Sequence, residues 1–152
     1  MRLTIDVQNA TSAASAPDDN TVREWVRSAA DGRVAGRAEL SVRFVDEEES
    51  RALNAGYRGR DRATNVLSFP AAGESVPNAP RPLGDVVICG PVVEREAREQ
   101  GKAAADHWAH LLVHGTLHLL GYDHESEDDA TAMESLERSI LAAGGVADPY
   151  EG

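Results

Sequence analysis

Cysteine is almost absent from this chain of 152 residues, with Cys89 as its single representative. One cysteine cannot form a disulfide within the chain, nor a structural zinc site built on several thiolates. It stands at the end of the apolar run 86–89, where a thiol is most often a small buried hydrophobic group. We therefore expect a fold held by an apolar core, which one domain spanning residues 1–152 is long enough to build.

Long hydrophobic runs are lacking as well. No apolar stretch approaches the roughly 20 residues that are needed to cross a bilayer. The first ten residues alternate apolar and polar side chains, whereas a signal peptide would present a continuous apolar core there. We expect a protein of the cytoplasm with no membrane partner.

Basic residues are few, since 15 Lys and Arg stand against 26 Asp and Glu and give a net charge of −11. Such a charge balance repels polyanions at long range and weighs against simple nucleic-acid binding. Positive charge is nevertheless gathered in segment 57–62, through Arg58, Arg60 and Arg62. Guanidinium groups suit phosphate oxygens, so this segment is a candidate anion site. The alternative for Arg58 is a surface arginine paired with a nearby acid.

Histidine is the residue type that says most about function. His114 and His118 are one helical turn apart, about 6 Å along the axis, so both can reach one metal ion. Gly121 can adopt the left-handed conformation that ends a helix, which allows His124 to approach them. Three neutral imidazoles with a fourth position open are typical of catalytic zinc. We predict one zinc ion on these three histidines, with Asp123 as the main rival to His124.

The histidine spacing matches the long zinc-peptidase signature His-Glu-x-x-His-x-x-Gly-x-x-His, except that Gly115 replaces the glutamate. That glutamate is the general base of those peptidases, so we expect no peptide substrate. A metallopeptidase or amidase remains an alternative, with Glu125 or Asp123 as its candidate base. Glycine inside a helix costs about 1 kcal/mol relative to alanine, which suggests that a strand or a substrate lies close to the backbone there.

Two further histidines precede this group. His110 and His118 are roughly 12 Å apart along a helix axis, which is too far for them to share an ion. We therefore expect His110 and His107 to pack, or to hydrogen-bond to the metal ligands.

Hydrophobic periodicity predicts an α+β fold: a single domain with a mixed sheet of about four strands, and helices mainly on one face. The expected strands are 3–8, 40–44, 66–69 and one that follows residues 83–85; the expected helices are 22–29, 47–54, 91–100, one carrying the first two metal-binding histidines, and one ending at 144–145. The expected helix starts are Asp19 or Asn20, Asp46, Pro91, Asp106 and Ser126, the last as a capping box with Asp129. Segment 71–82 is expected to be an irregular loop.

Over nearly its whole length the chain resembles the YbeY-type endoribonucleases, bacterial metal-dependent enzymes of ribosomal RNA maturation. The most specific parts are residues 114–124, Tyr-Arg-Gly-Arg-Asp at 57–61, Ala-Thr-Asn-Val-Leu-Ser-Phe-Pro at 63–70, and Leu-Gly-Asp-Val-Val-Ile-Cys at 83–89. The resemblance implies a mixed α and β fold, zinc on the three histidines, and Arg58 as the functionally important basic residue lining the cleft. It also implies action on precursor ribosomal RNA, especially the 3′ end of the small-subunit RNA, and a role in ribosome quality control with the small ribosomal subunit and its assembly factors.

A catalytic role for the site can be argued from chemistry. Zinc on neutral imidazoles lowers the pKa of bound water toward about 7, or it polarises a phosphoryl oxygen. We therefore count His114, as a zinc ligand, among the catalytic residues. Arg58, supported by Arg60 or Arg62, would bind the phosphate and neutralise charge that develops in the transition state. The non-catalytic alternative is a ribosome-assembly adaptor, in which Asp123 or Cys89 completes a structural zinc site with four protein ligands.

Three polar residues near these motifs have two interpretations each. Asp85 could orient a zinc-binding histidine, but we favour a hydrogen bond within its turn. Asn65 and Ser68 could contact substrate, although strand residues of these types more often bind neighbouring backbone.

Overall fold

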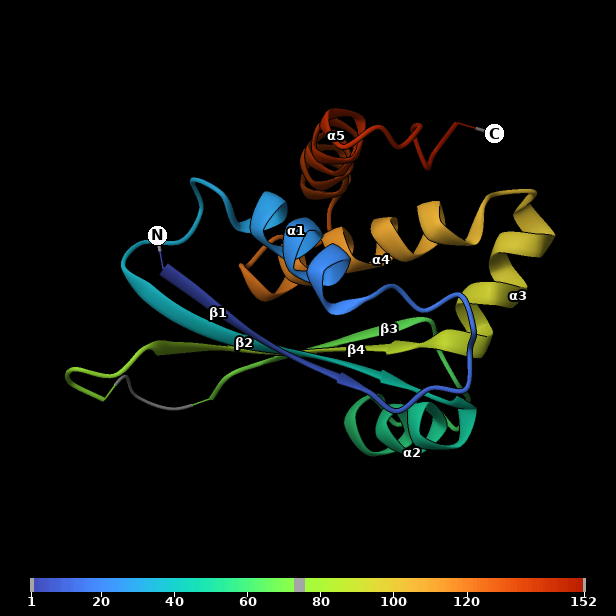
Figure 1. The fold of residues 1–152 in the computed structure, drawn as a ribbon, viewed down its shortest axis with the longest axis horizontal. Coiled ribbons are helices and arrows are strands. Elements are labelled where there is room, and N and C mark those ends of the chain that lie inside the picture. The colour runs from blue at the N-terminus through green and yellow to red at the C-terminus, as the bar shows by residue number, and fades with distance from the viewer. Residues whose placement is uncertain (1, 73–75, 152) are drawn as a thin grey trace.

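The sheet contains four strands in the order β1-β2-β4-β3 (Figure 1). The computed structural model describes residues 2–72 and 76–151. The strands are β1 (Arg2–Asn9), β2 (Arg37–Val45), β3 (Val66–Pro70) and β4 (Arg81–Cys89). β1, β2 and β4 run parallel to one another, and β3 runs antiparallel to β4 at the edge. The predicted mixed sheet is confirmed. The predicted irregular segment 71–82 ends earlier than expected because β4 begins at Arg81, and residues 73–75 lie outside the described ranges.

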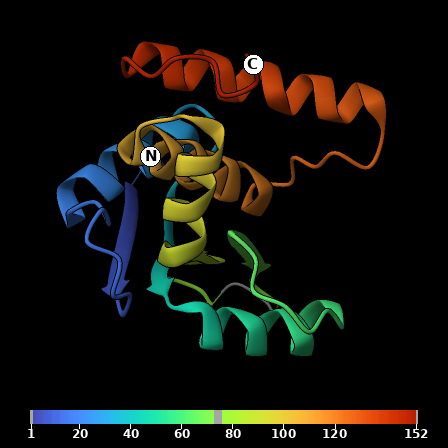
Figure 2. The ribbon, with the colours of Figure 1, turned by 90° about the vertical axis from the view of Figure 1, so that its right-hand side faces the viewer.

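Five helices complete the α+β fold: α1 (Asp19–Ala30), α2 (Glu47–Arg58), α3 (Gly90–Gln100), α4 (Ala104–Leu119) and α5 (Glu127–Ala143). α1 and α4 lie against one face of the sheet, and α5 lies beyond α4 (Figure 1). α2 lies on the opposite face (Figure 2). The expectation of helices mainly on one face is therefore confirmed. None of the helices within the described ranges is both long and apolar enough to span a membrane.

Alternation along β4 divides the core between the two faces of the sheet. Val86 and Ile88 belong to the main apolar cluster, together with Trp108 of α4. Val87 and Cys89 belong to a smaller cluster on the α2 side. Cys89 is thus buried on the face away from α4, and the fold does not present it to the α4 histidines as a fourth ligand.

Two helix starts differ from the prediction. Asp18, rather than Asp19 or Asn20, caps α1, because its side chain accepts a hydrogen bond from the Thr21 amide at 2.8 Å. α4 begins after Ala103, and Asp106 lies within its first turn without capping it. An acid in the first turn still interacts favourably with the helix dipole, which explains why it resembled a cap.

Two other starts agree with the prediction. Ser126 caps α5, and its hydroxyl accepts from the Asp129 amide at 3.1 Å. Pro91 stands in the first turn of α3, where its missing N–H is not needed. α3 ends at Gly101, which is left-handed with φ 65°.

α2 is longer than predicted, and this moves Arg58 from a loop into the last helical turn. The helix runs past residue 54 to Arg58 and ends at the left-handed Gly59. Asp46 precedes the helix, but its side chain accepts hydrogen bonds from Thr11 Oγ1 and the Ser12 amide instead of capping it. Arg60 and Arg62 follow in the exposed loop.

α4 approaches the sheet closely at Gly115. A Cβ at this position would lie 2.6 Å from Val86 Cγ1 and 3.1 Å from Val66 Cγ2. The Ser68 hydroxyl of β3 donates a hydrogen bond to the Gly115 carbonyl at 2.9 Å. We expected either a strand or a substrate close to the backbone at Gly115, and the structure has strands β3 and β4 there. The space that a general-base glutamate would need is therefore filled by the sheet.

Gly115→Ala is expected to destabilise the protein by about 1–2 kcal/mol, because overpacking outweighs the gain in helix propensity. A drop in the midpoint of thermal unfolding would measure this. Gly56→Ala is the matched control, since Gly56 is also helical and a Cβ there would meet nothing within 4 Å. That control is expected to gain about 0.5–1 kcal/mol. Equal stabilisation by both variants would contradict the close contact at Gly115.

Candidate metal centre

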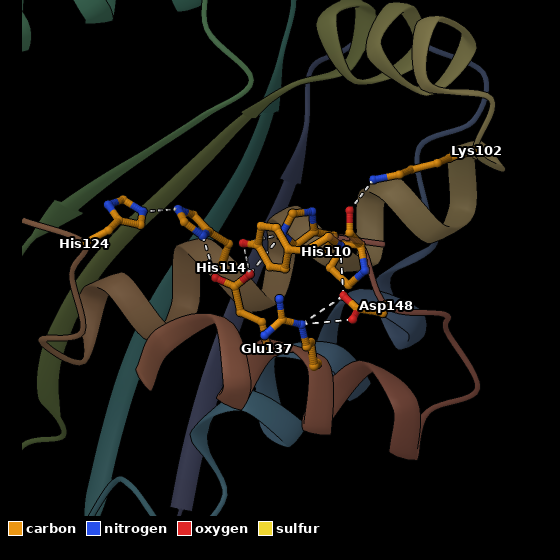
Figure 3. A network of polar contacts seen from close by, with 9 residues as sticks. Lys102, His110, His114, His124, Glu137 and Asp148 are labelled. Carbon is orange, nitrogen blue, oxygen red and sulfur yellow. Dashed lines mark hydrogen bonds and ion pairs between the residues drawn. The ribbon is translucent and has the colours of Figure 1, made fainter. Parts of the chain in front are cut away.

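The end of α4 and the turn that follows it gather three histidines. His114 and His118 lie one turn apart in α4, and Gly121 with φ 101° reverses the chain just after the helix. His124 thereby returns to His114, with the two Nε2 atoms 3.3 Å apart (Figure 3). The ring centroids are separated by 5.0 Å for His114 and His124, 6.0 Å for His118 and His124, and 6.4 Å for His114 and His118.

The approach of His114 to His124 fits a shared metal ion, whereas the ligand atoms of all three histidines do not fall within 4.8 Å of one another. Two nitrogens bound tetrahedrally to zinc at about 2.0–2.1 Å lie about 3.3–3.4 Å apart, which is the separation of the two Nε2 atoms. The His118 ring stands about 1 Å farther out than such an arrangement requires. His118 makes no hydrogen bond with the described residues, and its Nδ1 is buried without a partner. Its ring is therefore available as a ligand.

Glu137 of α5 is the buried acid beneath this group. It is fully buried, and its carboxylate accepts from three donors: His114 Nδ1 at 2.7 Å, His110 Nε2 at 2.9 Å and the Tyr150 hydroxyl at 2.5 Å. Burial raises the pKa of Glu137, but the hydrogen bonds from His110, His114 and Tyr150 outweigh it and lower the pKa to about 2. Glu137 is therefore ionised at neutral pH.

The ionised carboxylate determines which nitrogen of His114 can bind a metal. A carboxylate can only accept hydrogen bonds, so His114 Nδ1 must carry the proton that it donates to Glu137. The neutral ring then has its lone pair on Nε2, the atom that faces His124. A carboxylate that orients a histidine in this way is a common feature of zinc sites.

A second ligand group overlaps the first. His110, His114 and Glu137 offer three ligand atoms within 4.8 Å of one another and could hold a metal ion. Here, however, the contacts are hydrogen bonds of 2.7 and 2.9 Å, each with a proton between its atoms. A metal ion in this group would have to displace both protons. A metal ion at Nε2 of His114 would not have to displace the proton that Nδ1 donates to Glu137.

The charge of Arg58 reaches the histidine group. Burial is the main cause that lowers the pKa of His118, and His114, His124 and Arg58 lower it further through their charges. Tyr57 packs on Phe69 of β3, with ring centroids 4.5 Å apart, and this contact holds the last turn of α2 beside the sheet edge. The structure therefore brings Arg58 and the three histidines into one region.

The arginine segment is anchored by contacts that leave its three candidate arginines available. The Asn54 side chain donates to the Arg62 carbonyl, and Arg51 forms an ion pair with Asp61 at 2.6 Å. Within the described part of the chain, Arg58, Arg60 and Arg62 form no ion pair. In the described ranges Arg58 is therefore not paired with a nearby acid, which was the alternative expectation.

Asp123, the rival ligand to His124, and Glu125, the other candidate base of the peptidase alternative, lie in the turn after α4. Asp123 Oδ1 accepts from the Glu125 amide at 3.2 Å, so it stabilises the turn. The charge of Asp123 raises the pKa of His118, whereas the charge of Arg58 lowers it. Asp123 therefore lies near the histidines. Glu125 is exposed.

The remaining polar candidates, Asp85, Asn65 and His107, have other surroundings than the three histidines. Asp85 is exposed and alternates with Val86, so its side chain lies on the face of the sheet away from α4. The Asn65 amide donates to Glu96 Oε1 at 3.0 Å, and His107 Nε2 lies 2.9 Å from the same oxygen. His107 and His110 thus both hydrogen-bond to buried or half-buried glutamates, and only His110 shares its glutamate with His114.

Sequence reasoning missed Glu137. A glutamate in an amphipathic helix is ordinary, but this one stands in the buried stripe formed by Met133, Ile140 and Leu141. A carboxylate at a core position of a helix needs hydrogen-bond donors. A charged residue at an apolar position of the helical pattern was therefore the sequence signal that could have identified Glu137.

Together, the mixed sheet, the helix-borne histidines and the adjacent arginine define an α+β protein with a candidate metal centre at the end of α4. Residues 5–145 match the family described as Endoribonuclease YbeY. The chain belongs to the YbeY family.

Relatives named Endoribonuclease YbeY match most of the chain. The protein of Alkalilimnicola ehrlichii is 61% identical over 139 residues, which cover 90% of this chain and 84% of the relative. The protein of Halorhodospira halophila is 58% identical over 144 residues, which cover 92% of both chains. Among solved structures, the solution structure of TM1509 from Thermotoga maritima is 25% identical, with a TM-score of 0.59 over 98% of this chain and 100% of that one.

Proposed function

We propose that this protein is a zinc-dependent endoribonuclease acting on precursor ribosomal RNA, with one zinc ion held by His114, His118 and His124. The observation that carries the proposal is the 3.3 Å approach of His114 Nε2 to His124 Nε2, beside Arg58. The relatives named Endoribonuclease YbeY support the class of reaction. We take residues 1–152 as one catalytic domain.

The proposed ligand set rests on the donors that remain available. His110 and Glu137 are engaged in hydrogen bonds to each other, whereas His118 has no partner among the described residues. The Nε2 atom of His114 faces His124 rather than Glu137. In such a site zinc supplies Lewis acidity, which makes water nucleophilic near neutral pH or polarises a phosphoryl oxygen.

The protein side chains supply the remaining functions. Glu137 holds the proton on His114 Nδ1 and so keeps Nε2 free to bind. Arg58 would bind a phosphate oxygen and stabilise the negative charge that grows as the phosphodiester is cleaved. Arg60 and Arg62, exposed in the following loop, would extend this contact to neighbouring phosphates.

The small ribosomal subunit is the partner that we propose, with the 3′ end of its RNA as substrate and quality control of ribosomes as the wider role. The net charge of −11 disfavours capture of free RNA by long-range attraction. Assembly factors on the subunit would then bring the enzyme to its substrate in the cytoplasm.

Peptide hydrolysis is the competing function. It would need a base near the metal, and the position used by zinc peptidases is Gly115, where the sheet leaves no room for a side chain. Glu125 and Asp123 are the remaining candidates, and the second already accepts a hydrogen bond within its turn.

Removing the metal is expected to abolish cleavage of RNA. The purified protein would be assayed on an RNA containing the small-subunit 3′ end and on casein, before and after chelation, with metal content measured in parallel. Cleavage of RNA alone, lost on chelation and restored by zinc, is the expected result. Chelator-resistant RNA cleavage, or metal-dependent cleavage of casein alone, would contradict the proposal.

A further inference from the structure

The chain after α5 folds back toward the candidate metal centre. Asp148 forms an ion pair with Arg138 at 2.9 Å, and Lys102 donates to the Pro149 carbonyl at 2.8 Å (Figure 3). The returning segment runs alongside α5 (Figure 2). These contacts bring Tyr150 to Glu137, and the family match ends at residue 145, before this segment.

We propose that Tyr150 is a positioning residue of the metal centre, which acts on His114 through Glu137. This inference rests on the ligand set proposed above. The Tyr150 hydroxyl donates to Glu137 Oε2 at 2.5 Å, and His110 Nε2 lies 2.9 Å from the same oxygen. The other oxygen, Oε1, is left for His114 Nδ1 at 2.7 Å.

The physical basis is the freedom of a carboxylate to rotate. The terminal torsion of a glutamate is broad, so the backbone alone does not hold its two oxygens in place. Donors on Oε2 hold the group with Oε1 toward His114, which keeps the Nδ1 proton in place and Nε2 directed at His124. A separation of 2.5 Å is typical of a strong hydrogen bond from a hydroxyl to a charged carboxylate.

Tyr150 is well suited to this role because it stays protonated. Burial raises the pKa of Tyr150, and the hydrogen bond to Glu137 raises it further. Its ring is held independently of the hydroxyl, since it lies edge-on to His110 at 5.3 Å and beneath the guanidinium of Arg138 at 5.2 Å. The Tyr150→Phe substitution therefore removes the donor and retains the packing.

The test measures the zinc affinity of the metal-free protein by competition with a chelator. Tyr150→Phe is expected to weaken binding about 3–10-fold, and Glu137→Gln, which acts directly on His114, about 10–100-fold. As a spectroscopic readout on the metal-free protein, the His114 Nδ1 proton is expected to exchange faster with solvent in Tyr150→Phe. Zinc affinity and proton exchange equal to those of the unaltered protein would overturn the proposal.

Tyr57→Phe is the matched control. It makes the same change at an exposed tyrosine of α2, which packs on Phe69 through its ring and lies on the other face of the sheet from α5 (Figure 1), so zinc affinity is expected to stay unchanged. A loss in Tyr57→Phe equal to that in Tyr150→Phe would overturn a specific role for the Tyr150 hydroxyl. Failure of the ligand set itself has a different signature, because His124→Ala would then retain the zinc affinity of the unaltered protein.

Discussion

Replacing His124 with alanine is expected to weaken zinc binding by about 100-fold or more, because each ligand contributes several kcal/mol to a structured zinc site. The side chain contributes little else, since its recorded polar contact is the 3.3 Å approach to His114. Metal content after purification and the zinc dissociation constant, measured by competition with a chelator, would report the loss. RNA cleavage is expected to disappear with the metal.

His110→Ala is the variant that separates the two overlapping ligand groups. His110 belongs to the group with His114 and Glu137, but not to the three-histidine group. Its removal takes away one donor to Glu137, so we expect a loss of less than about tenfold in zinc affinity. If His110→Ala lost the metal while His124→Ala retained it, the ion would belong with His110 and Glu137, and the proposed ligand set would be wrong.

The predictable part of the fold is the part that is local in sequence. The strands and helices follow from apolar residues that recur at the periods of a strand and of a helix, and these periods need no tertiary information. The helix starts were less predictable. Asp18 and Asp19 are chemically equivalent caps, and Asp46 is diverted from capping by Thr11 and Ser12, which are remote in the chain. A local pattern does not contain such a contact.

The candidate site divides in the same way. His114, His118 and His124 are close because one helical turn and one left-handed glycine bring them together, and both features can be read from spacing. Glu137 reaches His114 only because α5 packs over α4, and Tyr150 reaches Glu137 only because the chain folds back after α5. The proximity of the three proposed ligands was therefore predictable, whereas the contacts of Glu137 and Tyr150 depend on tertiary packing.

Reversing the charge of Arg58 is expected to reduce RNA cleavage by about 100-fold or more while bound zinc stays unchanged, because a donor aimed at developing phosphate charge is worth about that much. Arg58→Glu places a carboxylate where the phosphate would bind. Stability should change little, since Arg58 is exposed and unpaired within the described residues. Cleavage of the small-subunit RNA fragment and metal content of the same preparation are the two measurements.

Arg27→Glu makes the same charge change in a closely matched setting. Arg27 is also exposed and also stands in the last turn of its helix, so both variants place an acid at the negative end of a helix dipole. Only Arg58 lies close enough to the histidines to lower the pKa of His118. Arg27→Glu is therefore expected to cleave RNA normally. Equal loss in both variants would indicate a general effect of net charge, and full activity in Arg58→Glu would remove Arg58 from the mechanism.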